Sequence, residues 1–513
     1  MRRGGNGSNS TFAVLITAKN QRSVLFRFIP RLSTLLAGVI RKWRGRWHEA
    51  ALVVGIAVGY MLYLFASQYQ HLYYDAELYW KLGHRFYQDG HFSLLAYDDS
   101  LRGYAYPLLN FVSLAVRKAL HLPAVVVVKV LNAAMAGLLF GLVGPRVWQA
   151  ATGAGQPPAI ARRLVWAGLV FIFWRDYFNF SLSDFPALLA LAVALWQVQR
   201  RRVSGVALAG MALALALNIR PIYLVAVPPV LALALLGHTR SEWLHRLAVL
   251  ALGAGLVLTP QWLINRRHFG VNTPLVLSRS KEPLIHNLYL KQLKWGLLYR
   301  KYETSVGKEL PTGQILFLDE RGRAVLQAEQ VNQFKSVSQY LRTVAHYPGV
   351  LARTYAWHLF SGLDISHPTP YLRRWAPAPW LAALNYSLWF WAALVIIGGG
   401  WPTRRQALML AALLLSCLAV LPMGMEVRFL LPLHLLLLAL VSFGALPGWA
   451  TASRARLIIV GVSYVVFLTT CFHLSARVLQ TIEPRFEAYL LPASGIVGST
   501  QSASDIQGKV KTQ

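Results

Sequence analysis

The chain has 513 residues, of which 56% are hydrophobic and only 14% are charged, and its formal net charge is +31. A soluble protein carries roughly a quarter charged residues, so this composition excludes an ordinary soluble enzyme and indicates a polytopic membrane protein. The positive charge does not indicate nucleic acid, because ten Lys and Arg residues and no acid fall within residues 1–48, directly before an apolar segment. Basic residues beside a membrane helix mark the cytoplasmic side and attract anionic headgroups. We therefore expect membrane lipids, and no nucleic acid, as partners.

Apolar windows along the chain predict an all-α polytopic membrane protein with about 11 transmembrane helices, within a range of about 11–13. The windows lie at residues 50–67, 123–145, 163–178, 185–199, 204–218, 221–237, 247–264, 378–398, 407–422, 429–446 and 457–473. With the N-terminus in the cytoplasm, every short loop on that side carries at least two arginines, as in Arg200, Arg201 and Arg202. This agreement favours both the number of helices and their orientation.

Two long segments fall on the outer side of the predicted membrane, and both contain short amphipathic stretches. Residues 106–122 form one such stretch, which is typical of a helix that lies along the membrane surface instead of crossing it. The predicted organisation is a basic cytoplasmic tail (1–48), an N-terminal transmembrane region (49–265) that includes the outer loop 68–122, a large outer loop (266–376), C-terminal transmembrane helices (377–473) and a flexible C-terminal tail (474–513).

One carboxylate, Asp75, lies just beyond the first apolar window and is flanked by Tyr73, Tyr74 and Tyr79 instead of by turn residues. Charges at membrane depth are costly and usually functional. Other charged residues fall at helix ends on the same predicted side: Glu77, Arg102, Lys129, Asp184, Arg220, Glu426 and Arg428. The sequence therefore predicts one polar site at the outer membrane surface, built from several separate loops and helix ends.

Each of these charges also has a purely structural explanation. Asp184 precedes Pro186 and suits a helix N-cap. Arg220 and Arg428 suit side chains that extend to lipid headgroups, and Glu426 suits a local ion pair with Arg428. The sequence leaves these alternatives open.

Four motifs occur in an order that resembles a known family. They are YDAELYW (74–80), LRGYAYPLL (101–109), SDFPALLALAVALW (183–196) and EVRFLLPLHLLLLAL (426–440). Together they resemble the GT-C superfamily of polyprenyl-phosphate-sugar-dependent glycosyltransferases, in particular its protein-mannosyltransferase and aminoarabinose-transferase branch. The resemblance covers about residues 50–445. Many members carry an Asp-Glu pair, whereas in this chain Ala76 separates Asp75 from Glu77.

The resemblance implies a GT-C-like fold and an integral-membrane enzyme that moves a hexosyl or pentosyl group from a polyprenyl-phosphate donor to an acceptor hydroxyl, with inversion. Asp75 is then the general base, and its apolar, tyrosine-rich setting is expected to raise its pKa from about 4 towards neutrality. Because arginine binds phosphate bidentately, the residues implied in binding the donor phosphate are Arg102, Arg220 and Arg428, together with Lys129. The residues implied in contacting the sugar or acceptor, or in orienting the arginines, are Glu77, Tyr79, Asp184 and Glu426.

The same resemblance implies a multi-pass protein of the bacterial inner membrane, with a cytoplasmic N-terminus and an active site in the loop 68–122 facing the periplasm. The acceptor stays open among a glycan, a lipid and a protein. The chemistry requires no cofactor and no metal site is predicted, although Asp98 and Asp99 leave room for a divalent ion. Two rival functions remain, an enzyme like an O-antigen ligase or polymerase, and a transporter or flippase of lipid-linked glycans.

Overall fold

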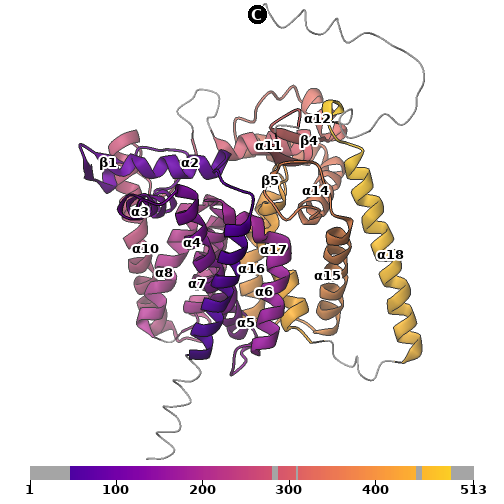
Figure 1. The fold of residues 1–513 in the computed structure, drawn as a ribbon, viewed down its shortest axis with the longest axis horizontal. Coiled ribbons are helices and arrows are strands. Elements are labelled where there is room, and N and C mark those ends of the chain that lie inside the picture. The colour runs from indigo at the N-terminus through magenta and orange to yellow at the C-terminus, as the bar shows by residue number, and fades with distance from the viewer. Residues whose placement is uncertain (1–46, 201, 280–286, 308–309, 446–452, 487–513) are drawn as a thin grey trace, which may run out of the picture.

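The computed structural model describes residues 47–486, apart from residues 201, 280–286, 308–309 and 446–452. Long helices run side by side through the molecule, and shorter elements lie across one end of them (Figure 1). We call the end that carries α2 (Tyr74–Gly83) and α3 (Ala105–Leu120) the α2 face, and the other end the opposite face. The basic tail that the sequence predicts at residues 1–48 lies almost entirely outside the described residues.

The long helices and their short extensions make up the body of the molecule. They are Trp47–Ala66, α4 (Ala124–Ala136) with η3 (Gly137–Val143) and α5 (Gly144–Thr152), α6 (Ile160–Trp174) with η4 (Arg175–Asn179), α7 (Asp184–Gln197), α8 (Val203–Ile219), η5 (Pro221–Ala226) with α9 (Val227–Leu235), α10 (Arg240–Phe269), α15 (Pro379–Gly398), α16 (Arg404–Val420), η6 (Val427–Leu430) with α17 (Leu431–Phe443), and α18 (Arg454–Leu479). Each of the eleven apolar windows predicted from the sequence coincides with one of these helical segments.

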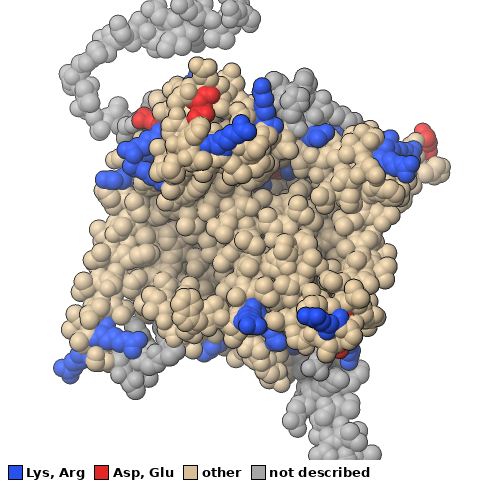
Figure 2. Space-filling view, turned by 180° about the vertical axis from the view of Figure 1, so that it is seen from behind, with Lys and Arg blue, Asp and Glu red and all other residues tan. Residues whose placement is uncertain are grey.

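Several of these helices are suited to a membrane. Among the described residues, five helices are long and apolar enough to cross a bilayer, and four further apolar helices are shorter. Charged side chains gather near the two ends of the molecule and leave a broad uncharged band between them (Figure 2). Large apolar side chains are exposed along the long helices, for example Leu252 and Leu256 of α10 and Val462 of α18. Such a surface is stable against lipid and not against water, so the chain is a helical membrane protein. The number of helices that cross stays a prediction.

The α2 face is covered by the elements of the two long loops. The first loop supplies α2, η1 (His84–Phe86), β1 (Tyr87–Gln88), β2 (His91–Phe92), η2 (Leu94–Ala96) and α3, and the second supplies α11 (Leu288–Leu298), β3 (Tyr299–Ser305), β4 (Gln314–Leu318), α12 (Glu320–Ala328), α13 (Val337–His346), α14 (Pro348–Leu363) and β5 (Tyr371–Leu372). Figure 1 shows α2 running across the ends of the long helices. This placement agrees with the expectation of surface helices in both loops.

A small sheet in the second loop was not predicted. Its strand order is β4-β3-β5, with β3 antiparallel to β4 and parallel to β5. The central strand reads YRKYETS and lacks the apolar alternation that usually marks a strand. Two of its charges are paired locally, because Lys301 Nζ lies 2.7 Å from Glu303 Oε1 and these side chains are only 6% and 12% exposed. The chain is therefore mostly helical, with a short sheet that helps to cover the α2 face.

The predicted start of the flexible tail at residue 474 is wrong, because α18 continues to Leu479 and the following residues are packed. Ile482 forms a bridge with Phe317 of β4, and Phe486 is only 1% exposed. Backbone hydrogen bonds tie this segment to the sheet, with Glu483 N donating to Leu316 O over 2.8 Å. Burial of these apolar side chains against the sheet is what holds the segment, and the sequence alone could not show that surface.

Candidate functional site

Asp75 is the second residue of α2, and the residues before it are held by the large loop. Tyr74 has φ +43°, in the left-handed region that is costly for an aromatic residue. Its hydroxyl donates to Ser305 O of β3 over 2.9 Å, and the hydroxyl of Tyr371 in β5 donates to Tyr73 O over 3.1 Å. These two contacts fix the turn that leads into α2, so the sheet of the second loop positions the carboxylate of the first.

Arg102 is positioned by a turn in the first loop. The Asp99 carboxylate accepts hydrogen bonds from the backbone N–H groups of Leu101, at 2.9 Å, and Arg102, at 2.7 Å. The next residue, Gly103, packs so closely on Asn218 of α8 that a Cβ there would overlap the Asn218 carbonyl. Only glycine allows this approach, which brings Arg102 to the end of α8.

Arg428 of η6 joins three carboxylates. Its Nη2 donates to Asp75 Oδ2 over 2.9 Å, its Nη1 lies 3.6 Å from Asp184 Oδ2, and its Nε lies 2.8 Å from Glu426 Oε2. Arg102 Nη2 reaches the other oxygen of Asp75 over 3.4 Å. Asp75 therefore lies between two guanidinium groups, and Arg428 links it to two further acids.

Asp184 is bound by an arginine instead of capping a helix. It is the first residue of α7, where Ser183 occupies the N-cap position and no side chain caps the helix. The Asp184 carboxylate accepts a hydrogen bond from Arg220, which ends α8. The ring of Phe429 lies 5.8 Å from the Arg220 guanidinium and 6.0 Å from that of Arg428. The N-cap alternative for Asp184 and the headgroup alternative for the two arginines are therefore wrong in this structure.

The six residues form one ion network, which we call the Asp75 network: Asp75, Arg102, Asp184, Arg220, Glu426 and Arg428. Its three carboxylates and three guanidinium groups balance in formal charge. The exposed fraction of the side chains is 32% for Asp75, 24% for Arg102, 21% for Arg220, 13% for Arg428, 7% for Glu426 and 1% for Asp184. The network is thus accessible at Asp75, Arg102 and Arg220, whereas the carboxylates of Asp184 and Glu426 are buried. Within the described part of the chain, no group accepts a hydrogen bond from Arg102 Nε.

The environment shifts the pKa values of Asp75 and Glu426 in opposite directions. Burial raises the pKa of Asp75, but the Arg428 and Arg102 charges outweigh it and hold this pKa below its usual value. The expectation of a raised pKa was therefore wrong, because the tyrosines around Asp75 come with two paired arginines. Burial raises the pKa of Glu426 above its usual value, despite the charge of Arg428.

Two tyrosines border the Asp75 network. Tyr79 is buried, and its ring centroid lies 5.3 Å from the Arg102 guanidinium carbon. The hydroxyl of Tyr302 in β3 donates to Glu426 Oε2 over 3.0 Å. Sequence reasoning missed Tyr302, since it lies outside every motif and its strand carries no apolar pattern.

Two of the predicted residues lie elsewhere. The Nζ of Lys129, a buried residue of α4, donates to Ser67 Oγ over 3.2 Å, away from the Asp75 network. Glu77 is on the exposed side of α2, where it forms an ion pair with Lys81 at 2.6 Å. The roles predicted for Lys129 and Glu77 gain no geometric support.

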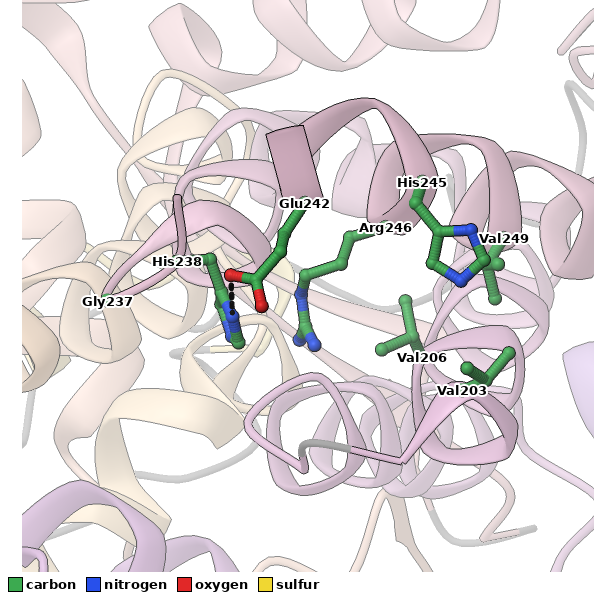
Figure 3. A pocket seen from close by; sticks show the side chains of 8 residues that line it. All are labelled: Val203, Val206, Gly237, His238, Glu242, His245, Arg246 and Val249. Atoms are coloured by element: carbon green, nitrogen blue, oxygen red, sulfur yellow. Dashed lines mark hydrogen bonds and ion pairs between the residues drawn. The ribbon is translucent and has the colours of Figure 1, made fainter. Parts of the chain in front are cut away.

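A separate pocket of about 290 Å³ lies on the opposite face, between α8 and the start of α10 (Figure 3). His238 Nδ1 lies 3.3 Å from Glu242 Oε2, and Arg246 extends beside them. The Arg246 guanidinium donates to Ala234 O over 2.7 Å and to Val198 O over 2.8 Å, which are carbonyls at helix ends. Arg246 thus ties three helices together, and we do not treat this pocket as the site.

In the part of the chain that the structure describes, no group of three or more His, Cys, Asp or Glu residues has an arrangement that holds a metal ion. Asp99 uses its carboxylate in the turn before Arg102, and Arg85 Nη1 donates to Asp98 Oδ1 over 2.9 Å. Comparisons of the chain with protein-family models, with curated proteins and with solved structures found no match.

Proposed function

We propose that this protein is a membrane glycosyltransferase that moves a sugar from a polyprenyl-phosphate carrier to an acceptor hydroxyl. The observation that carries the proposal is the position of Asp75, a partly exposed carboxylate held between Arg102 and Arg428 at 3.4 and 2.9 Å. This reaction needs a group that accepts a proton and, beside it, groups that bind a phosphate. A carboxylate next to guanidinium groups supplies both functions.

The three arginines supply the site for the donor phosphate. Guanidinium groups bind phosphate oxygens bidentately and keep their charge at any physiological pH. Arg102 and Arg220 are the more exposed of the three, and the N–H of Arg102 Nε has no acceptor among the described residues. Asp75 lies in α2, which runs across the ends of the long helices, so a donor whose chain stays in lipid would present its phosphate at this level.

The reaction is a single displacement. An oxygen of Asp75 accepts the proton of the acceptor hydroxyl as that hydroxyl attacks the anomeric carbon. The bond between the anomeric carbon and the phosphate oxygen breaks, and the phosphate leaves with the electron pair to the arginines. Attack opposite to the leaving group inverts the anomeric configuration.

Donor binding itself would activate the base. The charges of Arg428 and Arg102 beside Asp75 lower its pKa and weaken it as a proton acceptor. A phosphate on the same guanidinium groups competes with Asp75 for them and adds a negative charge nearby. Both effects raise the pKa of Asp75, so proton transfer is favoured only when donor is bound.

We place the protein in the bacterial inner membrane, with the N-terminus in the cytoplasm and the α2 face in the periplasm. The arginine-rich loops of the opposite face support this orientation through the preference of basic residues for the cytoplasmic side. The acceptor is a glycan, a lipid or a protein that reaches the exposed side of Asp75.

The test is transfer of radiolabelled sugar from a polyprenyl-phosphate donor by the purified chain in detergent. Asp75→Asn is expected to lower the rate about 10²–10⁴-fold while donor binding is retained. Asp89→Asn is the matched control, because Asp89 is exposed and its φ of +50° is one that asparagine also adopts. Equal rates in the wild type and Asp75→Asn would remove Asp75 from the chemistry, as the ligase or polymerase alternative requires. Donor binding without any transfer would favour the transporter alternative.

A further inference from the structure

A second polar pocket adjoins the Asp75 network, between β3, the loop 366–370 and the start of η6. Its polar lining includes Tyr177, Glu303, Ser366, His367, Thr369 and Glu426. We call it the Glu303–His367 pocket. Glu426 belongs both to this lining and to the Asp75 network, so the two are continuous. Neither Glu303 nor His367 lies in a motif that the sequence analysis singled out.

His367 presents an unused nitrogen in this pocket. Its Nδ1 lies 3.1 Å from Ser366 Oγ, and its ring packs on Trp375 with 5.3 Å between centroids. The residue is 9% exposed, and its Nε2 has no hydrogen-bond partner among the described residues. A buried polar atom without a partner is unfavourable, so this nitrogen is arranged for a group that enters the pocket.

Glu303 is held as a carboxylate beside it. The Nζ of Lys301 lies 2.7 Å from its Oε1. Burial raises the pKa of Glu303, but the charge of Lys301 and its hydrogen bond outweigh that effect and leave this pKa below its usual value. The pocket therefore offers two carboxyl groups, those of Glu303 and Glu426. Each is already paired with a cation, Lys301 and Arg428 respectively.

A contrasting pocket lies on the other side of Arg428. Asp184, Arg220, Arg428 and Phe429 contribute to its lining, so it carries two guanidinium groups against one carboxylate. An anion is favoured there and disfavoured next to Glu303 and Glu426. A sugar phosphate has the same two parts, an anionic phosphate and an uncharged ring of hydroxyl groups.

We propose that the Glu303–His367 pocket binds the sugar ring of the donor, with Glu303 and His367 selecting a sugar that carries no carboxylate. This proposal rests on the proposed function. Carboxylates and an imidazole are strong partners for sugar hydroxyls, while a uronic acid would place a third carboxylate beside Glu303 and Glu426. The cavity now encloses about 10 Å³, roughly the space of one water molecule. The loop that carries His367 therefore has to move away from β3 when the ring enters.

The experiment measures dissociation constants of the purified full chain for four probes. These are bare polyprenyl phosphate and polyprenyl phosphates that carry glucose, mannose or glucuronic acid. The wild type is expected to bind the glucosyl or mannosyl form more tightly than the bare form, and the glucuronyl form no more tightly. His367→Ala should weaken binding of the preferred form about tenfold and leave bare polyprenyl phosphate unchanged. His367→Gln, which keeps a hydrogen-bonding group, should recover part of the loss.

Two matched controls separate the pocket from the rest of the loop. His346→Ala removes an exposed histidine of α13, and Glu320→Gln removes an exposed acid of α12. Both should bind all probes like the wild type, whereas Glu303→Gln should weaken the preferred sugar form and tolerate glucuronic acid better.

The outcomes distinguish the two proposals. If the wild type does not bind bare polyprenyl phosphate, the proposed function is wrong and the sugar site with it. If the bare form binds and no sugar adds affinity, or His367→Ala and Glu303→Gln bind every probe like the wild type, only the sugar site is wrong. In that case the pocket holds a structural water.

Discussion

Arg428 and Asp75 are 353 residues apart in the sequence, yet Arg428 Nη2 donates to Asp75 Oδ2 over 2.9 Å. Asp75 begins α2 after the first long helix, and Arg428 lies in η6 before α17. The strand β3 of the second loop is bonded to the segment just before η6, since Tyr302 N donates to Met425 O over 2.9 Å. The network therefore exists only when the early helices, the second loop and the late helices are assembled together.

Substitution of Arg428 by lysine should separate charge from geometry. Lysine keeps the positive charge but lacks the planar fork, so it cannot contact Asp75, Asp184 and Glu426 at once. We expect Arg428→Lys to fold and to lower the transfer rate about 10²–10³-fold, with weaker donor binding. Arg117→Lys, at an exposed position of α3, is the control and should change neither quantity. A wild-type transfer rate in Arg428→Lys would show that the planar guanidinium group of Arg428 is not needed for transfer.

The pH dependence of stability should reveal the pKa of Asp75. Its folded pKa lies below the unfolded value of about 3.9. The ionised carboxylate therefore stabilises the fold fully above about pH 4, and this contribution is lost as the pH falls through the folded pKa. The Tm difference between the wild type and Asp75→Asn should be constant from about pH 5 to about pH 7 and shrink below about pH 4. If the Tm difference instead changes between about pH 5 and pH 7, the pKa of Asp75 is raised, as its tyrosine-rich surroundings suggested, and not lowered.

The side of the membrane on which the charges gather was predictable, but their pairing was not. Asp184 and Arg220 lie at the ends of apolar helices and Asp75 follows the first long helix, and helix ends can be read from hydropathy. The position of a residue along a helix does not show in which direction around the helix axis its side chain points. Lys129 has the expected depth, yet its side chain points to Ser67 and away from the Asp75 network.

The sequence also did not predict the sheet or its side chains. The strand that carries Tyr302 and Glu303 is polar, and it is stable because its charges are paired and its backbone bonds with β4 and β5. His367 comes from a loop, where no periodicity indicates burial. The second polar pocket thus became visible only when β3 and the loop 366–370 of the second loop were seen together with η4 and η6.

A buried histidine should stabilise the helix body without affecting donor binding. Trp174 Nε1 donates to His434 Nδ1 over 3.0 Å, and His434 Nε2 lies 3.0 Å from Asn385 Oδ1. These contacts join α6, α17 and α15. His434→Leu leaves the Trp174 N–H and an Asn385 oxygen without partners, so we expect a loss of about 1–3 kcal/mol.

The measurement is thermal unfolding of purified His434→Leu, Trp174→Phe and the double variant in detergent. The two single losses should not add, because both remove the same hydrogen bond. Additive losses would show that Trp174 and His434 act independently, and a changed donor affinity would show that the contacts also shape the site.

The tight packing of α8 on α10 gives a prediction in which the same substitution has different effects at neighbouring positions. A Cβ at Gly253 of α10 would overlap the carbonyl of Ala207 in α8, and one at Gly210 of α8 would overlap the carbonyl of Leu250. Gly255, two residues along α10, has no atom within 4 Å of such a Cβ. Small residues let membrane helices pack at backbone distance, so Gly253→Ala must force α8 and α10 apart and should lower Tm. Gly255→Ala should leave Tm equal or slightly higher, because alanine is the better helix former by about 1 kcal/mol. Equal Tm values for the two variants would mean that α8 and α10 are not held at this distance. Because Arg220 directly follows α8, a looser α8 would also weaken the Arg220 contact with Asp184.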